Sequence, residues 1–215
     1  MDPFRLCMIS GSFEYESEAS LTLYQDYIAK HRPKIETTLI VYQSEDDHQS
    51  LEPIENTDVL LVFTRRVNTA GAELDRFMKY CQDGRPIVGV RTASHAFQNW
   101  LAFDKEVQGG NYEGHYGGGP VAHITKESGA VAHPILSQVE PFDSQGSLYI
   151  NTPIAEDTTL LLTGHTDEHE EPVAWTRMHN GGRVFYTSLG HQEDFKDNDF
   201  LKLLTNAVRW AARRL

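Results

Sequence analysis

The first hundred residues alternate short apolar runs with stretches of helical periodicity. The run over residues 59–63 is continuously apolar, which is typical of a strand buried on both faces. In the stretch after it, apolar side chains recur from Leu74 to Cys81 with the i, i+3, i+4 and i+7 spacing of one helix face. Alternation of this kind predicts an α/β fold with a mostly parallel sheet and helices on both of its faces.

The second half of the chain has a different pattern, in which short apolar runs follow one another without intervening helices. We expect strands over 4–10, 35–42, 58–64, 86–90, 121–125, 147–150, 159–163, 173–177 and 183–187. We expect helices over 17–30, 69–82 and 198–213, with a further helix after the strand at 86–90. A hairpin turn at 179–182 then makes the C-terminal half an antiparallel extension of one domain that spans 1–215.

Composition excludes several classes of partner. The net charge of −12 disfavours a nucleic acid and an anionic membrane surface, since both require a basic face. No apolar run approaches the roughly 18–20 residues that span a bilayer, and the N-terminus lacks a signal-peptide pattern. Two cysteines, predicted to be buried thiols, suit a reducing cytoplasm. A small-molecule partner is expected; a homodimer is compatible with this fold class, but no residues mark a surface for it.

The stretch 86–97 is the first candidate for a site, because an apolar strand there runs into small and polar residues. Open α/β sheets bind their ligands at this carboxyl edge. Arg91 would hold a carboxylate or sugar hydroxyls, or else form a structural ion pair with an acid. Ser94 is predicted to cap the following helix, and His95 to belong to the site. Adjacent helical residues point apart, so Ser94 and His95 are not expected to form a nucleophile–base pair.

Other candidates come from the ten histidines of the chain. His191 follows the strand predicted at 183–187, and Glu193 two residues later would orient it as a general base. His115 and Tyr116 are the sizeable side chains of the glycine-rich loop 109–119. The histidine spacings match no metal-binding motif, so no metal and no cofactor are expected. A metal site assembled from separate loops is the alternative.

Five motifs resemble the ThuA-like (trehalose-utilisation) family and together cover most of the chain. They lie at 87–97, 114–119, 133–135, 171–177 and 182–191, the last continuing into the final helix. The resemblance implies a flavodoxin-like sheet of the class I glutamine amidotransferase-like type. In true amidotransferases a Cys nucleophile occupies the turn after the central strand, and a His and a Glu come from a later strand end. By position these are Arg91, His191 and Glu193 in this sequence.

An arginine cannot attack an amide, so glutaminase activity is not expected. The resemblance implies instead a role in carbohydrate catabolism, on a small sugar or an oxidised sugar derivative. In that interpretation His191, Glu193, His95 and His115 are the catalytic residues, and Arg91, Ser94 and Tyr116 bind the substrate. The alternative is a non-catalytic sugar-binding or protein-interaction domain that kept the pocket without the nucleophile.

Overall fold

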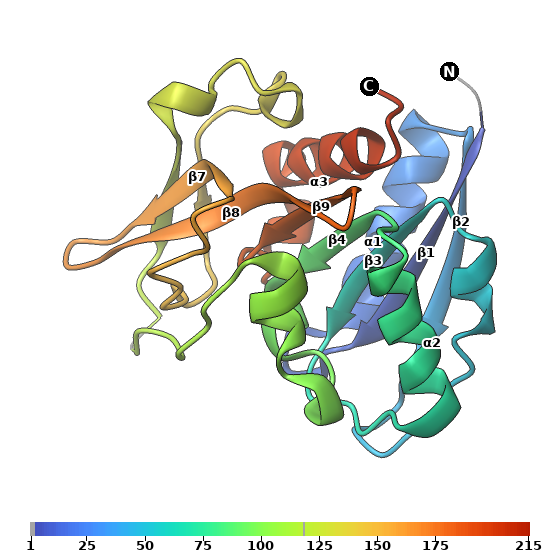
Figure 1. The fold of residues 1–215 in the computed structure, drawn as a ribbon. Coiled ribbons are helices and arrows are strands. Elements are labelled where there is room, and N and C mark those ends of the chain that lie inside the picture. The colour runs from blue at the N-terminus through green and yellow to red at the C-terminus, as the bar shows by residue number, and fades with distance from the viewer. Residues whose placement is uncertain (1–2, 118) are drawn as a thin grey trace.

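A nine-stranded sheet runs through the computed structural model, which describes residues 3–117 and 119–215 (Figure 1). Its strands lie in the order β2-β1-β3-β4-β9-β8-β7-β5-β6. Their bounds are β1 Phe4–Gly11, β2 Ile35–Val41, β3 Val59–Thr64, β4 Ile87–Val90, β5 Ala122–Lys126, β6 Phe142–Ser144, β7 Thr159–His165, β8 Glu170–His179 and β9 Gly182–Thr187. The α-helices are α1 Ser17–His31, α2 Gly71–Gln82 and α3 Asn198–Ala211. None of the helices in the described ranges has the length and apolar character that crossing a bilayer requires.

The sheet is mixed, which corrects the expectation of a mostly parallel one. Strands β2, β1, β3, β4 and β9 run parallel, whereas β9, β8, β7, β5 and β6 pair antiparallel. The antiparallel half stands out to one side of the molecule (Figure 1). The connection between β8 and β9 requires this direction, since a two-residue turn at Asn180 and Gly181 can join only antiparallel strands. The hairpin predicted at this turn is confirmed.

Side chains that alternate along the central strands build two separate hydrophobic clusters. Val59, Leu61 and Phe63 of β3 belong to the cluster that contains the buried residues of α1 and α3. Leu60 and Val62 belong to the cluster that contains those of α2. Because consecutive side chains of a strand point to opposite faces, burial on both sides requires the continuous apolar run seen in the sequence.

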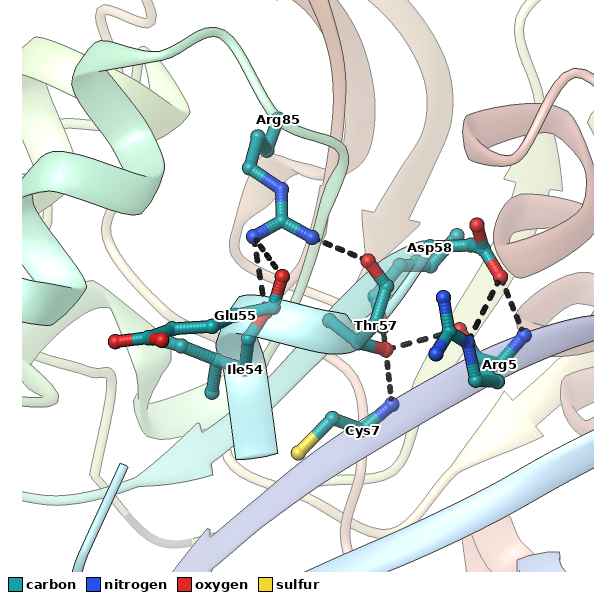
Figure 2. A network of polar contacts seen from close by, with 8 residues as sticks. Arg5, Cys7, Ile54, Glu55, Thr57, Asp58 and Arg85 are labelled. Carbon is teal, nitrogen blue, oxygen red and sulfur yellow. Dashed lines mark hydrogen bonds and ion pairs between the residues drawn. The ribbon is translucent and has the colours of Figure 1, made fainter. Parts of the chain in front are cut away.

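Polar contacts fix the ends of β1 and β3 opposite the carboxyl edge (Figure 2). The Thr57 hydroxyl accepts a hydrogen bond from the backbone N–H of Cys7 over 2.9 Å. The Asp58 carboxylate accepts one from the backbone N–H of Arg5 over 2.7 Å. The Arg85 guanidinium donates to the carbonyl oxygens of residues 54, 55 and 57. The bonds of Thr57 and Asp58 tie the start of β3 to β1, and in the register of these strands Gly11 lies opposite Thr64, so both end at the same level at the other edge of the sheet.

Strands β4 and β9 are neighbours, and both end at the carboxyl edge of the sheet. Val90 is registered with Thr187, so the turn after β4 and the segment after β9 are neighbours. The helix predicted after β4 is replaced by short turns, 3₁₀ at Arg91–His95 and Gln98–Trp100 and π-helical at Asp104–Gln108. Phe97 is extended and bridges Val67, which prevents a continuous helix.

Two further predictions about this region were wrong. Ser94 caps no helix, since it lies inside the 3₁₀ turn. Residues 147–150 form no strand, because Tyr149 makes only an isolated bridge to His115. The edge strand β6, at 142–144, pairs with β5 in its place.

Replacement of Gly89 in β4 by Ala tests how tightly the centre of the sheet is packed. A methyl group there would overlap the side-chain oxygen of Gln108 and lie 3.0 Å from the Tyr186 ring. We expect Gly89→Ala to lower the free energy of unfolding by about 1–3 kcal/mol, measured by urea denaturation. Gly129→Ala is the control, because its methyl group would meet no atom within 4 Å. Equal stability of the two variants would contradict this account of the packing.

Candidate functional site

Arg91 occupies the turn at the carboxyl end of β4 with a left-handed backbone, φ +47°. Its side chain is 1% exposed. One guanidinium nitrogen, Nη1, donates to the Ser188 carbonyl oxygen over 2.7 Å. The other, Nη2, donates to the Tyr15 hydroxyl over 3.1 Å and to the Ser147 carbonyl oxygen over 3.2 Å. The arginine therefore joins segments from the ends of β1, β4 and β9 and from the antiparallel half.

Two tyrosine rings enclose the same guanidinium. Its central carbon lies 4.3 Å from the centroid of the Tyr15 ring and 4.7 Å from that of Tyr149. Cation–π attraction of this kind strengthens when the charge is removed from water. We call Arg91, Tyr15, Tyr149, Ser147 and Ser188 the Arg91 cluster. These protein groups enclose the guanidinium, and direct contact of Arg91 with a ligand stays a prediction.

The side chains of Ser94 and His95 are in contact, although adjacent residues of a helix were expected to point apart. The Ser94 hydroxyl lies 2.9 Å from Nδ1 of His95, because the turn is 3₁₀ rather than α-helical. The His95 ring is 5% exposed and stacks on Tyr112, with centroids 4.6 Å apart. Burial, and then the nearby positive charges of Arg66, Arg65 and Arg91, lower the pKa of His95 to about 3. His95 is consequently a neutral imidazole at physiological pH.

A pocket of about 290 Å³ opens beside this pair. It is lined by Arg66, Ser94, His95, Leu101, Asp104, Lys105, Asn111, Tyr112 and Glu113. These residues come from the loop after β3, from the short turns after β4 and from the start of the glycine-rich loop. The pocket thus lies at the carboxyl edge of the parallel strands, where the sequence predicts a ligand site.

Asp104 is the residue of this pocket that the sequence did not reveal. Its carboxylate is buried, with Oδ2 accepting from the Tyr112 backbone N–H over 2.9 Å and Oδ1 from Nε2 of Gln108 over 3.3 Å. No ion pair with Asp104 is found within 3–117 and 119–215. Burial raises its pKa to about 6, against the opposing effect of these hydrogen bonds. The sole sequence signal is Gly110, where any side chain would overlap this carboxylate.

His191 lies at the end of β9 as predicted, but a different acid organises its segment. The Glu193 carboxylate pairs with Lys196 over 2.6 Å, and only its backbone N–H reaches Nδ1 of His191, over 3.2 Å. Asp194 is buried, and its Oδ2 accepts from the backbone N–H groups of Gly190 and His191. The carboxylate of Glu193 therefore does not orient the His191 ring in this structure.

The remaining predicted residues lie apart from the pocket. The exposed His115 ring is 6.5 Å from that of Tyr149, and the His191 ring is 6.2 Å from that of Tyr15. The Tyr116 hydroxyl donates to Glu171 over 3.0 Å, and Tyr116 lines another cavity, of about 790 Å³. The structure thus brings Ser94 and His95 together. His115 and His191 lie beside tyrosines of the Arg91 cluster, and one of these, Tyr149, has its ring 6.5 Å from that of His95. No three His, Cys, Asp or Glu side chains among the described residues are arranged to hold a metal ion.

Replacing Arg91 by Lys tests the Arg91 cluster. An ammonium group is a point donor and cannot span the Ser188 and Ser147 carbonyl oxygens as a guanidinium does. We expect Arg91→Lys to lower the free energy of unfolding by about 2–4 kcal/mol in urea denaturation. Arg5→Lys is the matched control; its ion pair with Asp58 is exposed, so the loss should stay below about 1 kcal/mol. An Arg91→Lys variant as stable as the parent would contradict the assignment.

The two displaced pKa values predict pH effects of opposite sign. The folded state holds a proton on Asp104 more tightly than the unfolded state, so this group's contribution to stability is lost as pH rises from about 4 to 6. The folded state resists protonation of His95, so its contribution is lost as pH falls below about 6.5. We expect each effect to be a few kcal/mol.

Urea denaturation between pH 4 and 8 separates the two effects. The free energy of unfolding of the parent minus that of Asp104→Asn should fall with rising pH. The free energy of unfolding of the parent minus that of His95→Gln should rise with rising pH. A flat difference curve for either variant would show that the corresponding group has the same pKa in the folded and unfolded chains.

Comparison with known proteins places these features in a family. The family model ThuA, described as trehalose utilisation, matches residues 8–211. No functionally curated protein matches the chain. A structure from Bacteroides uniformis described as ThuA-like has a TM-score of 0.74 at 20% identity, covering 98% of this chain and 92% of that one. A second structure described as ThuA-like, from Parabacteroides merdae, has a TM-score of 0.73 at 16% identity, covering 98% of this chain and 90% of that one.

The fold is also shared with a glutamine amidotransferase from Thermotoga maritima, with a TM-score of 0.60 at 11% identity over 99% of both chains. At such low identity this likeness concerns the fold alone. The family model, in contrast, spans nearly the whole sequence and includes the turn after β4, the glycine-rich loop and the end of β9. The chain therefore belongs to the ThuA (trehalose utilisation) family.

Proposed function

We propose that this protein acts in carbohydrate catabolism and binds a small sugar or oxidised sugar derivative in the pocket beside Ser94 and His95. The observation that carries the proposal is the meeting of a buried, unpaired carboxyl group, Asp104, with the Ser94–His95 pair in one cavity. Burying such polar groups costs stability, and they gather where a ligand uses them. The trehalose-utilisation family supplies the class of ligand.

The size and polarity of the pocket support a sugar. Its volume of about 290 Å³ lies near the lower end of the roughly 300–1,000 Å³ typical of ligand sites. This suits one sugar ring better than a chain of them. Arg66, Lys105 and Asn111 offer donors, and Asp104 and Glu113 offer acceptors. A ring of hydroxyl groups, each able to donate and accept, matches a mixed lining of this kind.

Glutamine amidotransferase activity is not part of this proposal. The turn after β4, which resembles the position of the amidotransferase nucleophile, carries Arg91, whose guanidinium cannot form an acyl intermediate. We further propose that the chain acts as one domain in the cytoplasm, a location that the free, buried thiols of Cys7 and Cys81 suit. Catalytic roles for His191, Glu193 and His115, and substrate binding by Tyr116, rest on the family resemblance.

A second candidate function is binding without turnover. It is favoured by Arg91, because this side chain fills the place of the nucleophile and its Nη1 and Nη2 donate to protein groups. In that case the pocket would sense a sugar rather than transform it. Ligand binding is common to both candidates, so it is the property to test first.

Thermal unfolding with added ligands tests the pocket. The ligands are trehalose, D-glucose, D-fructose and 2-keto-D-gluconate. Each is added to the parent protein and to the variants Arg66→Gln and His48→Ala. A ligand that binds only the folded state raises the unfolding midpoint, by an amount set by its concentration and Kd. We expect at least one sugar to raise the midpoint of the parent and of His48→Ala, an exposed site away from the pocket lining. Arg66→Gln should lose most of that shift, because Arg66 lines the pocket.

Isothermal titration calorimetry with the responding sugar then gives Kd for the three proteins. A weakening of about tenfold or more in Arg66→Gln corresponds to at least ~1.4 kcal/mol of binding free energy. Equal affinity in Arg66→Gln and the parent would place the sugar outside this pocket, and no binding by any member of the panel would contradict the proposed ligand class.

A further inference from the structure

Asp104 lacks a structural reason for being an acid. It is 6% exposed, and its two hydrogen bonds come from neutral groups that an asparagine oxygen could also satisfy in part. A buried carboxyl group without a cationic partner is costly. It also sits in the π-helical turn Asp104–Gln108, an irregularity that is frequent at functional sites. Its position on the wall of a pocket indicates a use toward a ligand.

We infer that Asp104 exchanges a proton with a carbon atom next to the carbonyl group of a small hydroxy-aldehyde or hydroxy-ketone, while His95 donates a hydrogen bond to that carbonyl oxygen. The inference rests on the proposed function, since it assumes that the pocket binds a sugar. It adds a reaction class, isomerisation or epimerisation through an enediol, and it assigns the two roles to Asp104 and His95.

The geometry around His95 suits a hydrogen-bond donor. The Ser94 hydroxyl lies 2.9 Å from Nδ1 of His95 and also donates to the Arg91 carbonyl oxygen over 3.4 Å. The proposed role requires the tautomer in which the ring proton is on Nε2, the other polar atom of the imidazole. Stacking on Tyr112 fixes the plane of the ring. The backbone N–H of the same Tyr112 holds the Asp104 carboxylate, so one residue positions both groups. A base and a donor held by a common neighbour keep their separation constant during a reaction.

The step balances without an oxidant or a further reactant. The Asp104 carboxylate removes a proton from the carbon beside the carbonyl group, and the electron pair of that C–H bond forms a C=C bond. The carbonyl π electrons move to oxygen, whose developing charge accepts the hydrogen bond from Nε2 of His95. Return of the proton from Asp104 to the neighbouring carbon, with transfer of a hydroxyl proton between the oxygens, interconverts ketose and aldose. Delivery of a proton from solvent to the opposite face of the same carbon, with Asp104 releasing its own proton to solvent, is epimerisation.

Electrostatics supports these roles. Burial raises the pKa of Asp104 and lowers that of His95. Asp104 can therefore take up a proton near neutral pH, whereas His95 stays a neutral imidazole. Groups displaced in opposite directions in one site are the usual mark of such a division of roles.

Proton exchange with solvent tests the inference directly. The protein is incubated in D₂O with dihydroxyacetone, D-fructose and D-glucose, and loss of the C–H signal beside the carbonyl group is followed by ¹H NMR. Trehalose, which has no carbonyl group, is the sugar control. We expect deuterium incorporation with at least one carbonyl sugar, at a rate that rises with pH through about 6 as Asp104 ionises. Asp104→Asn should lower the rate at least about 100-fold while calorimetry shows binding retained.

Two further variants complete the test. His95→Gln should lower the exchange rate by about 100-fold, as loss of one donor to a developing oxyanion does. Asp26→Asn, an exposed acid on α1, should leave the rate unchanged. Binding of a carbonyl sugar without exchange, or undiminished exchange in Asp104→Asn, would overturn the inference and leave the proposed function intact. Absence of binding by every sugar would overturn both.

Discussion

The buried guanidinium of Arg91 is the interaction on which the carboxyl edge of this molecule depends. It donates to backbone oxygens at 188 and 147 and lies between Tyr15 and Tyr149, so it joins segments that are far apart in the sequence. At the corresponding turn an amidotransferase resembling this fold would expose a nucleophile. Here the strained turn supports the structure instead. The pocket lies further along the same edge and is lined in part by residues that follow the turn.

The same positive charge shapes that pocket. Together with Arg66 and Arg65, and after burial itself, Arg91 keeps His95 neutral. Asp104, which has no ion-pair partner within the described ranges, responds to burial in the opposite sense. A neutral donor and a weakly acidic carboxyl group in one cavity follow from packing, because each is displaced mainly by removal from water. The electrostatic character of the site is thus mainly a consequence of the burial of His95 and Asp104 themselves.

Local patterns in the sequence predicted the parallel half well. Each of β1, β2, β3, β4, α1, α2 and α3 lies within a few residues of its expected range, because buried strands and amphipathic helices carry their periodicity in neighbouring residues. Failures occurred where distant contacts decide the outcome. Phe97 is extended because it pairs with Val67, and residues 147–150 lose their strand because Tyr149 pairs with His115. Asp104 gave no local signal, since its burial depends on Tyr112 and Gly110.

The family motifs direct attention to the carboxyl edge, where the pocket beside Ser94 and His95 lies, but they do not predict the contacts there. They directed attention to Glu193, whereas the neighbouring Asp194 holds the backbone of His191. They also included the glycine-rich loop, from which they selected His115. The residue of this loop that contacts the pocket groups is Tyr112, whose backbone N–H donates to Asp104 and whose ring stacks on His95. That loop is the first part of the chain to cross from the parallel half toward the antiparallel one, pairing with residues 148 and 150 on the way. A ligand in the pocket would therefore be held by the parallel half and by the loop that ties it to the antiparallel half, which gives the extension a reason to be part of one continuous sheet.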